Sequence, residues 1–250
     1  MKYRAISFHG FDGRKEELEA IERFKSLSPM HYRTNDYSHS HRVLWLAEDI
    51  LPYAVTVFPN LNVEMTRTLS PTHDDPEIII GDIELDQKLK MSVQELHQLE
   101  QDESAAIEIL AARFPKMING FNYRELLYHA LRKNSIEAQL VSYVDKIDAR
   151  EESRHEIAAG NKLFIPSAQR YDAIFKAKET RWPLITSLFG CGHPFFTEML
   201  EQDLETIAKK GTFHTPESIQ QRSGDPAYDC WKRITIERCG IESLVTVKES

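Results

Sequence analysis

The segment THDDPEIIIGD, residues 72–82, combines four carboxylates and a histidine with three consecutive isoleucines. Isoleucine side chains favour burial, and burial makes an unpaired carboxylate costly. A bound cation would offset that cost, because it compensates the carboxylates and accepts a lone pair from an imidazole nitrogen. If the segment is helical, His73, Asp74 and Glu77 share one side and the isoleucines wrap the others into the core. The segment therefore predicts part of a metal site built against a hydrophobic core.

Two other segments supply further candidate ligands, because one histidine and one aspartate are too few to hold an ion. His39 lies near the start of the amphipathic segment SHSHRVLWLAEDIL, residues 38–51. Asp145 borders an apolar stripe within residues 135–160, where a carboxylate is costly unless it is paired or bound to a metal. The candidates therefore follow the order His, His-Asp, Asp, each on a different predicted helix.

Helical patterns dominate the chain, and we expect an all-α fold. After Asn161 proline and glycine interrupt the pattern more often, so we divide the chain into a body, residues 1–160, and a mainly helical C-terminal extension, residues 161–250, packed on it. The only strand predicted is IESLVTVK, residues 241–248. The predicted helices cover residues 13–27, 38–51, 62–80, 94–114, 122–133, 135–160, 168–179 and 194–210.

Composition excludes several classes of protein. Lys and Arg number 31 against 39 Asp and Glu, a formal net charge of -8, and no basic stripe suited to nucleic acid is visible. No apolar run is long enough for a membrane span, and the N-terminal residues lack the apolar core of a signal peptide. Three cysteines, an odd count, favour a reducing compartment, so we expect a cytoplasmic protein. A homodimer stays open.

The ordered pattern H…HD…D resembles the HD-domain metal-dependent phosphohydrolases, and its details are most like the 5′-deoxynucleotidase branch. The resemblance is carried by HSHRV at residues 39–43, HDDPEIIIGDI at 73–83 and SIEAQLVSYVDKID at 135–148. It implies an HD-domain helical bundle and the divalent-metal-dependent hydrolysis of a deoxynucleoside monophosphate to a deoxynucleoside and phosphate. Upstream of the first ligand this chain lacks the tryptophan of the family, and Pro71 and Thr72 precede the HD pair where the family is usually apolar.

The resemblance also assigns roles. The divalent ion it implies is Co, Mn, Mg, Fe, Ni or Zn, and the cations nearest the ligand helices are candidates for binding the nucleotide phosphate. Its four metal ligands match His39, His73, Asp74 and Asp145, its catalytic acids match Glu77 and Asp82, and the candidate phosphate-binding residues are Arg33 and Lys146.

Three alternatives stay open. The first is a deoxynucleoside triphosphohydrolase or another HD phosphodiesterase. A triphosphate pocket would need several basic residues, and the small number of Lys and Arg near the ligand motifs argues against it. The second is a diiron HD oxygenase, which would need additional histidine ligands. The third is a non-catalytic protein with a structural metal, distinguished from an enzyme by the lack of an open coordination position.

Overall fold

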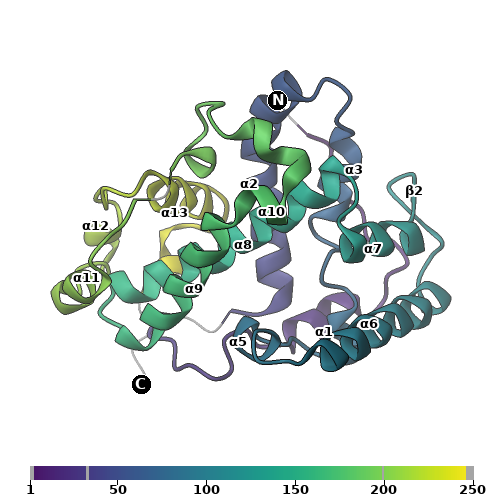
Figure 1. The fold of residues 1–250 in the computed structure, drawn as a ribbon, viewed down its shortest axis with the longest axis horizontal. Coiled ribbons are helices and arrows are strands. Elements are labelled where there is room, and N and C mark those ends of the chain that lie inside the picture. Colours follow the sequence, from purple (N-terminus) through teal and green to yellow (C-terminus); the bar gives the residue numbers. More distant parts are fainter. Residues whose placement is uncertain (1–2, 32–33, 199, 246–250) are drawn as a thin grey trace.

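The computed structural model describes residues 3–31, 34–198 and 200–245, and its fold is all-α with one small hairpin, as predicted (Figure 1). The hairpin pairs β1 (Met117–Ile118) and β2 (Phe121–Asn122) antiparallel. The α-helices are α1 (Arg14–Glu19), α2 (Asp36–Val57), α3 (Val63–Leu69), α4 (Glu77–Ile80), α5 (Leu85–Lys88), α6 (Val93–Arg113), α7 (Tyr123–Arg132), α8 (Ile136–Ala158), α9 (Ile165–Lys176), α10 (Lys178–Arg181), α11 (Leu204–Lys210), α12 (Pro216–Ile219) and α13 (Pro226–Cys239). Short 3₁₀ turns are η1 (Lys162–Phe164), η2 (Pro183–Leu188), η3 (Pro194–Phe196) and η4 (Ile241–Leu244).

Helix α8 is the centre of the bundle, and helices α2, α3, α7, α9 and α13 pack around it (Figure 1). Almost every side chain from Ala138 to Ala158 is buried, including charged ones. The charged side chains are paired, because an isolated buried charge is costly: Arg42 of α2 binds both Asp148 and Glu152. Helix α8 is therefore buried on nearly all sides, and not only along the apolar stripe beside Asp145.

Helix α2 carries the first candidate ligand into the core. Asn35 caps its N-terminus, and the side chain and backbone of Ser38 complete a reciprocal capping box. The helix therefore starts two residues before the helix predicted over residues 38–51, and it continues through Pro52 to Val57. His39 lies in its first turn and is fully buried.

Three sequence predictions of regular structure are wrong in part. The helix predicted over residues 13–27 ends at Glu19, because Arg23 donates its backbone N–H to Thr34 and Phe24 takes a left-handed backbone conformation with φ of 52°. Between α3 and α4, residues 70–76 form turns, and α4 keeps only four residues. Among the described residues of 194–210, only α11 and the short turn η3 are helical.

The strand predicted over residues 241–248 is also wrong where the structure describes it. Ile241–Leu244 forms the 3₁₀ turn η4, which follows Gly240 with a φ of 82°, so the chain coils back onto α13 instead of extending. Residues 246–248 lie outside the described residues. None of the described helices combines the length and the apolar character needed to cross a bilayer.

One hydrophobic core joins the two parts of the chain. Trp231 of α13 and Phe196 of η3 belong to the same buried cluster as Val43 of α2 and Tyr143 of α8. The extension therefore packs on the body over a large apolar area, while its boundary at residue 160 stays a prediction.

Candidate metal centre

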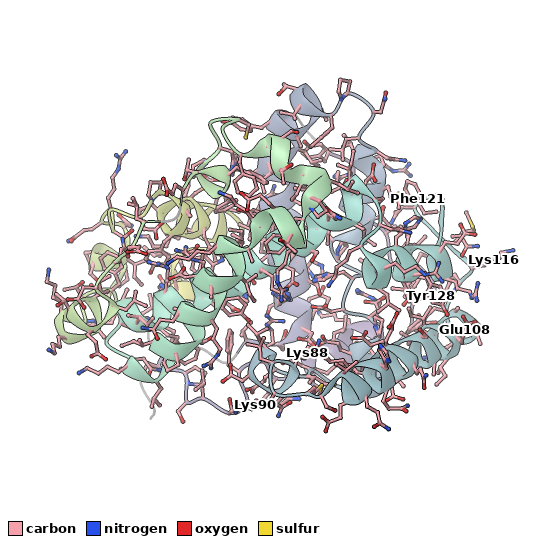
Figure 2. All side chains as sticks on the ribbon, in the orientation of Figure 1. Lys88, Lys90, Glu108, Lys116, Phe121 and Tyr128 are labelled. Carbon is pink, nitrogen blue, oxygen red and sulfur yellow. The ribbon has the colours of Figure 1, made fainter. Side chains whose placement is uncertain are left out.

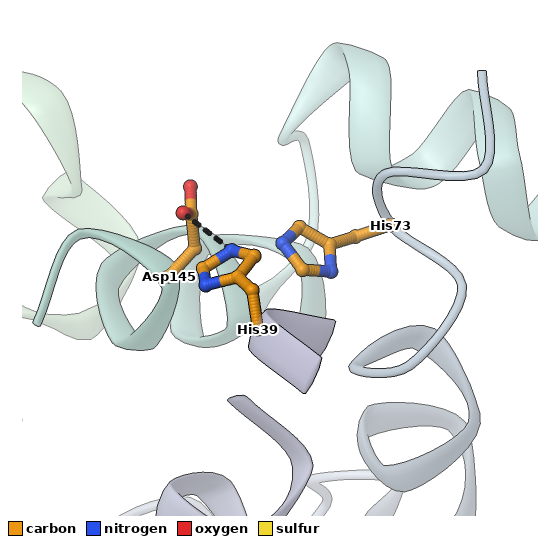
Figure 3. Close-up of side chains that lie close together, drawn as sticks. All are labelled: His39, His73 and Asp145. Carbon is orange, nitrogen blue, oxygen red and sulfur yellow. Dashed lines mark ion pairs between the residues drawn. The ribbon is translucent and has the colours of Figure 1, made fainter. Parts of the chain in front are cut away.

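Two histidines and two aspartates from three segments meet at one point of the bundle. Nε2 of His39 lies 3.3 Å from a carboxylate oxygen of Asp74 and 3.3 Å from one of Asp145. Nε2 of His73 lies 3.2 Å from the same oxygen of Asp74. Figure 3 shows the two imidazole rings and Asp145 turned toward one another from α2, the turn before α4, and α8. The structure thus brings together the four predicted ligands.

The hydrogen bonds behind both rings fix which nitrogen faces the cluster. Nδ1 of His39 lies 2.7 Å from Asp148, which accepts its proton, and Nδ1 of His73 donates to the carbonyl oxygen of Ser70 at 2.7 Å. In neutral rings of this tautomer, Nε2 carries a lone pair. Both Nε2 atoms are buried, and neither makes a hydrogen bond with a described residue.

Two imidazole lone pairs directed at carboxylate oxygens repel unless a cation or a proton lies between them. A mixed set of imidazole and carboxylate ligands suits a divalent metal. The two Nε2 atoms without a hydrogen-bond partner therefore show that these side chains fit a divalent ion.

The pKa values of the clustered side chains also indicate that positive charge stabilises the cluster. Burial raises the pKa of Asp74, but the facing His73 and His39 outweigh it and hold that pKa below its usual range. Burial likewise opposes protonation of His39, yet Asp145, Asp148 and Asp74 together raise its pKa well above the usual value. Without an ion, the cluster is thus stabilised by positive charge on His39.

Glu77 lies beside the ligands in a group of acids. Its carboxylate, that of Asp36 and that of Asp74 each place an oxygen within 4.8 Å of the others. Burial, and then the charges of Asp74, Asp36 and Asp82, raise the pKa of Glu77 well above the usual value, and burial raises that of Asp36 to about 6. Burial among other acids therefore favours the protonated forms of Glu77 and Asp36 more than water would.

The cluster opens onto a cavity of about 440 Å³. His73, Asp74, Asp145, Glu77 and Asp82 all line it. Its remaining wall combines apolar side chains with several lysines and arginines. A small molecule in this cavity would be next to three of the four candidate ligands and both candidate catalytic acids.

Comparison with known proteins gives the family. Residues 13–183 match the family described as 5'-deoxynucleotidase YfbR-like. The chain belongs to this YfbR-like family. The family is a member of the HD-domain superfamily, so the resemblance seen in the sequence is confirmed, and the protein is a metal-dependent phosphohydrolase of the 5′-deoxynucleotidase type.

A solved structure shares the fold of this YfbR-like protein. It is a conserved hypothetical protein from Pyrococcus furiosus, with a TM-score of 0.51 and 19% sequence identity over 70% of this chain and 95% of the other. At that identity the likeness concerns the fold alone. No curated protein sequence matches the chain significantly.

The two predicted phosphate-binding residues of the YfbR-like protein have different outcomes. Arg33 lies outside the described residues. Lys146 lines the cavity, and its Nζ lies 2.5 Å from a carboxylate oxygen of the adjacent residue, Asp145.

Sequence reasoning missed Arg23, a nearly buried arginine at the same site. Its guanidinium lies 3.6 Å from Asp36, 4.0 Å from Asp74 and 3.8 Å from Glu152, and it lines the cavity. In the sequence Arg23 falls within an apparent amphipathic helix, which gave no reason to place it near the HD pair. The irregular backbone after α1 directs it there.

Two supporting networks were also missed. Asp75 accepts hydrogen bonds from Arg14 at 2.6 to 3.0 Å and from the hydroxyl of Tyr123 at 2.7 Å, and Arg14 also donates to the carbonyl oxygen of Pro71. This buried clamp fixes the turn that carries the HD pair. On the other side, the indole N–H of Trp231 donates to Asp148 at 2.7 Å.

Proposed function

We propose that the YfbR-like protein hydrolyses a deoxynucleoside 5′-monophosphate at the cluster of His39, His73, Asp74 and Asp145. The observation that carries the proposal is the pair of buried imidazole nitrogens, whose lone pairs converge with two carboxylates at the wall of an open cavity. A structural metal site would be closed by its protein ligands, whereas this one leaves room for substrate.

The four side chains would hold one divalent ion of the Co, Mn, Mg, Fe, Ni or Zn group. When bound, such an ion supplies Lewis-acid activation of water and neutralises charge on the phosphoryl group. Asp148 keeps the imidazole of His39 in the tautomer that exposes Nε2, and Ser70 does the same for His73.

Protein side chains carry the remaining steps. Arg23, on the cavity wall within 4.0 Å of Asp74, is placed to bind the phosphate oxygens, with Lys146 as a second cation. Glu77, whose raised pKa favours its protonated form, gives a proton to the leaving O5′ atom, and Asp82 orients the attacking water. The products are a deoxynucleoside and orthophosphate.

The surroundings of the site favour a small nucleotide over a nucleic acid. Phe24, Leu127, Leu131 and Tyr171 give the cavity an apolar part for a base, and the chain carries a net charge of -8. We also propose that the protein acts in the cytoplasm, because its three cysteines are all free. A homodimer is compatible with these features.

A panel of nucleoside mono-, di- and triphosphates tests the activity. Each is incubated with the protein and one of several divalent ions, and released orthophosphate, pyrophosphate and triphosphate are measured. Orthophosphate from deoxynucleoside monophosphates is expected. Pyrophosphate or triphosphate released from triphosphates would instead favour the triphosphohydrolase alternative, and no phosphate with any ion would refute the proposal.

Two variants separate metal binding from chemistry. Asp74→Ala removes a ligand, so both metal content and activity are expected to fall to background. Glu77→Gln keeps the ligands and is expected to retain metal while losing about 10²–10⁴-fold in kcat, the range for a removed proton donor. Full metal content in Asp74→Ala would refute the ligand assignment.

A further inference from the structure

The cavity beside the candidate ligands is richer in cations than the local sequence suggests. Several of the basic side chains come from residues that are distant from the ligand motifs in the sequence. The small number of Lys and Arg near those motifs therefore does not count against a substrate with several negative charges. Besides Arg23, the basic residues on its wall are Lys88, Lys133, Lys146, Arg170 and Arg181.

Three of these, Lys88, Lys133 and Lys146, form one group, which we call the lysine cluster. They come from the end of α5, the end of α7 and the middle of α8. All three line the same cavity. Burial and the positive charges of Lys146 and Lys88 lower the pKa of Lys133, although Asp145 and Glu103 act in the opposite direction. Lys146 contacts the ligand Asp145, so the cluster begins at the metal centre and extends away from it.

Lys88 and Lys133 are not held in close ion pairs. Neither ammonium forms an ion pair within 4.0 Å with any residue in the ranges 3–31, 34–198 and 200–245. By contrast, Arg170, on the same wall, is bound by Asp86. Glu103, which also lines the cavity, interacts electrostatically with both lysines without forming an ion pair within 4.0 Å, and its burial raises its own pKa. The ammonium groups of Lys88 and Lys133 are therefore available to bind an anion in the cavity.

The backbone fixes where the cluster lies. Lys133 ends α7 in a left-handed conformation with φ of 51°, a position that glycine would occupy without strain. Its N–H donates to the carbonyl of His129, and its own carbonyl accepts from the side chain of Gln139. The start of the Lys133 side chain is thus held in place although its ammonium is free to bind.

We propose that the lysine cluster is a second anion subsite, and that the substrates preferred by this site are deoxynucleoside 3′,5′-bisphosphates. The inference rests on the proposed function. The 5′-phosphoryl group lies at the metal centre, where water forms the new P–O bond, the P–O5′ bond breaks and a proton passes to O5′. The 3′-phosphate binds Lys88 and Lys133 and is released unchanged on the product, a deoxynucleoside 3′-monophosphate.

The test compares kcat/KM for a 3′,5′-bisphosphate, a 5′-diphosphate and a 5′-monophosphate of the same deoxynucleoside in the full-length, metal-supplemented protein. The bisphosphate is expected to exceed the monophosphate by at least about tenfold, and the ratio to fall to about one in Lys88→Gln/Lys133→Gln. The control is Lys90→Gln, an exposed lysine near Lys88 that does not line the cavity (Figure 2), which is expected to keep the full ratio. Raising the salt concentration is expected to lower the ratio.

Equal kcat/KM for bisphosphate and monophosphate would overturn the inference while leaving the proposed function intact. A preference for the 5′-diphosphate alone would overturn it too, since it would place the second phosphate next to the first. Loss of activity toward the monophosphate in the double variant, by the same factor as toward the bisphosphate, would show that the lysines bind the reacting phosphate instead. Absence of phosphate release from every monophosphate would refute the proposed function itself.

Discussion

Replacing Asp75 with alanine tests the clamp behind the HD pair. Asp75 and Arg14 form an ion pair at 2.6 Å, and their side chains are 0% and 2% exposed. The substitution leaves the Arg14 guanidinium buried without a counter-ion and the hydroxyl of Tyr123 without its acceptor. Breaking one side of such a buried pair costs about 3–5 kcal/mol, a large part of the free energy of unfolding of a typical domain.

The free energy of unfolding is measured by urea denaturation followed by circular dichroism, with metal-free protein so that ligand binding does not contribute. The control is Glu19→Gln, which breaks the exposed pair with Lys15 and is expected to cost at most about 0.5 kcal/mol. The double variant Arg14→Met/Asp75→Ala is expected to recover part of the loss, since it removes the unpaired charge. A loss below about 1 kcal/mol in Asp75→Ala would refute the reasoning.

Two further predictions concern residues distant from the cavity. Trp231→Phe removes the indole donor to Asp148 but keeps most of the packing. The affinity for a divalent metal, measured by competition with a chelator, is expected to fall about 10- to 100-fold with little change in helix content. An unchanged affinity would contradict this prediction. His31 is buried against the ring of His155, and burial lowers its pKa from 6.5 to about 4. The unfolded chain therefore binds this proton at higher pH than the folded one, and the free energy of unfolding is expected to fall by up to about 3 kcal/mol as pH drops from 6.5 to 4. His31→Phe is expected to flatten this pH dependence. The control His97→Gln, at an exposed position, is expected to leave it unchanged. Equal pH profiles for the unaltered protein and both variants would exclude His31 as the cause.

The sequence predicted the parts of the fold and site that depend on local pattern. The all-α class and the helices around His39 and Asp145 follow from amphipathic periodicity, and the structure brings together the four residues that the H…HD…D order identified. Their role as ligands stays a prediction, as do those of Glu77 and Asp82.

What the sequence did not predict depends on contacts between distant residues. Arg23 reaches the site because its backbone pairs with Thr34 and ends the predicted helix early, which no periodicity reveals. The lysine cluster is assembled from three helices that are adjacent only in the folded bundle. The strand predicted at residues 241–248 followed β-propensity, but packing against α13 favoured a 3₁₀ turn at its start.

The bond from Trp231 to Asp148 also bears on how the enzyme matures. His39, His73 and Asp145 all leave the ribosome well before α13 does, yet Asp148 has its full set of donors only once Trp231 has docked. If His39 binds the ion as proposed, the full set of bonds that orients its imidazole through Asp148 would require α13 to be in place. We therefore expect nucleotidase activity to depend on the C-terminal helices as well as on the body of the chain.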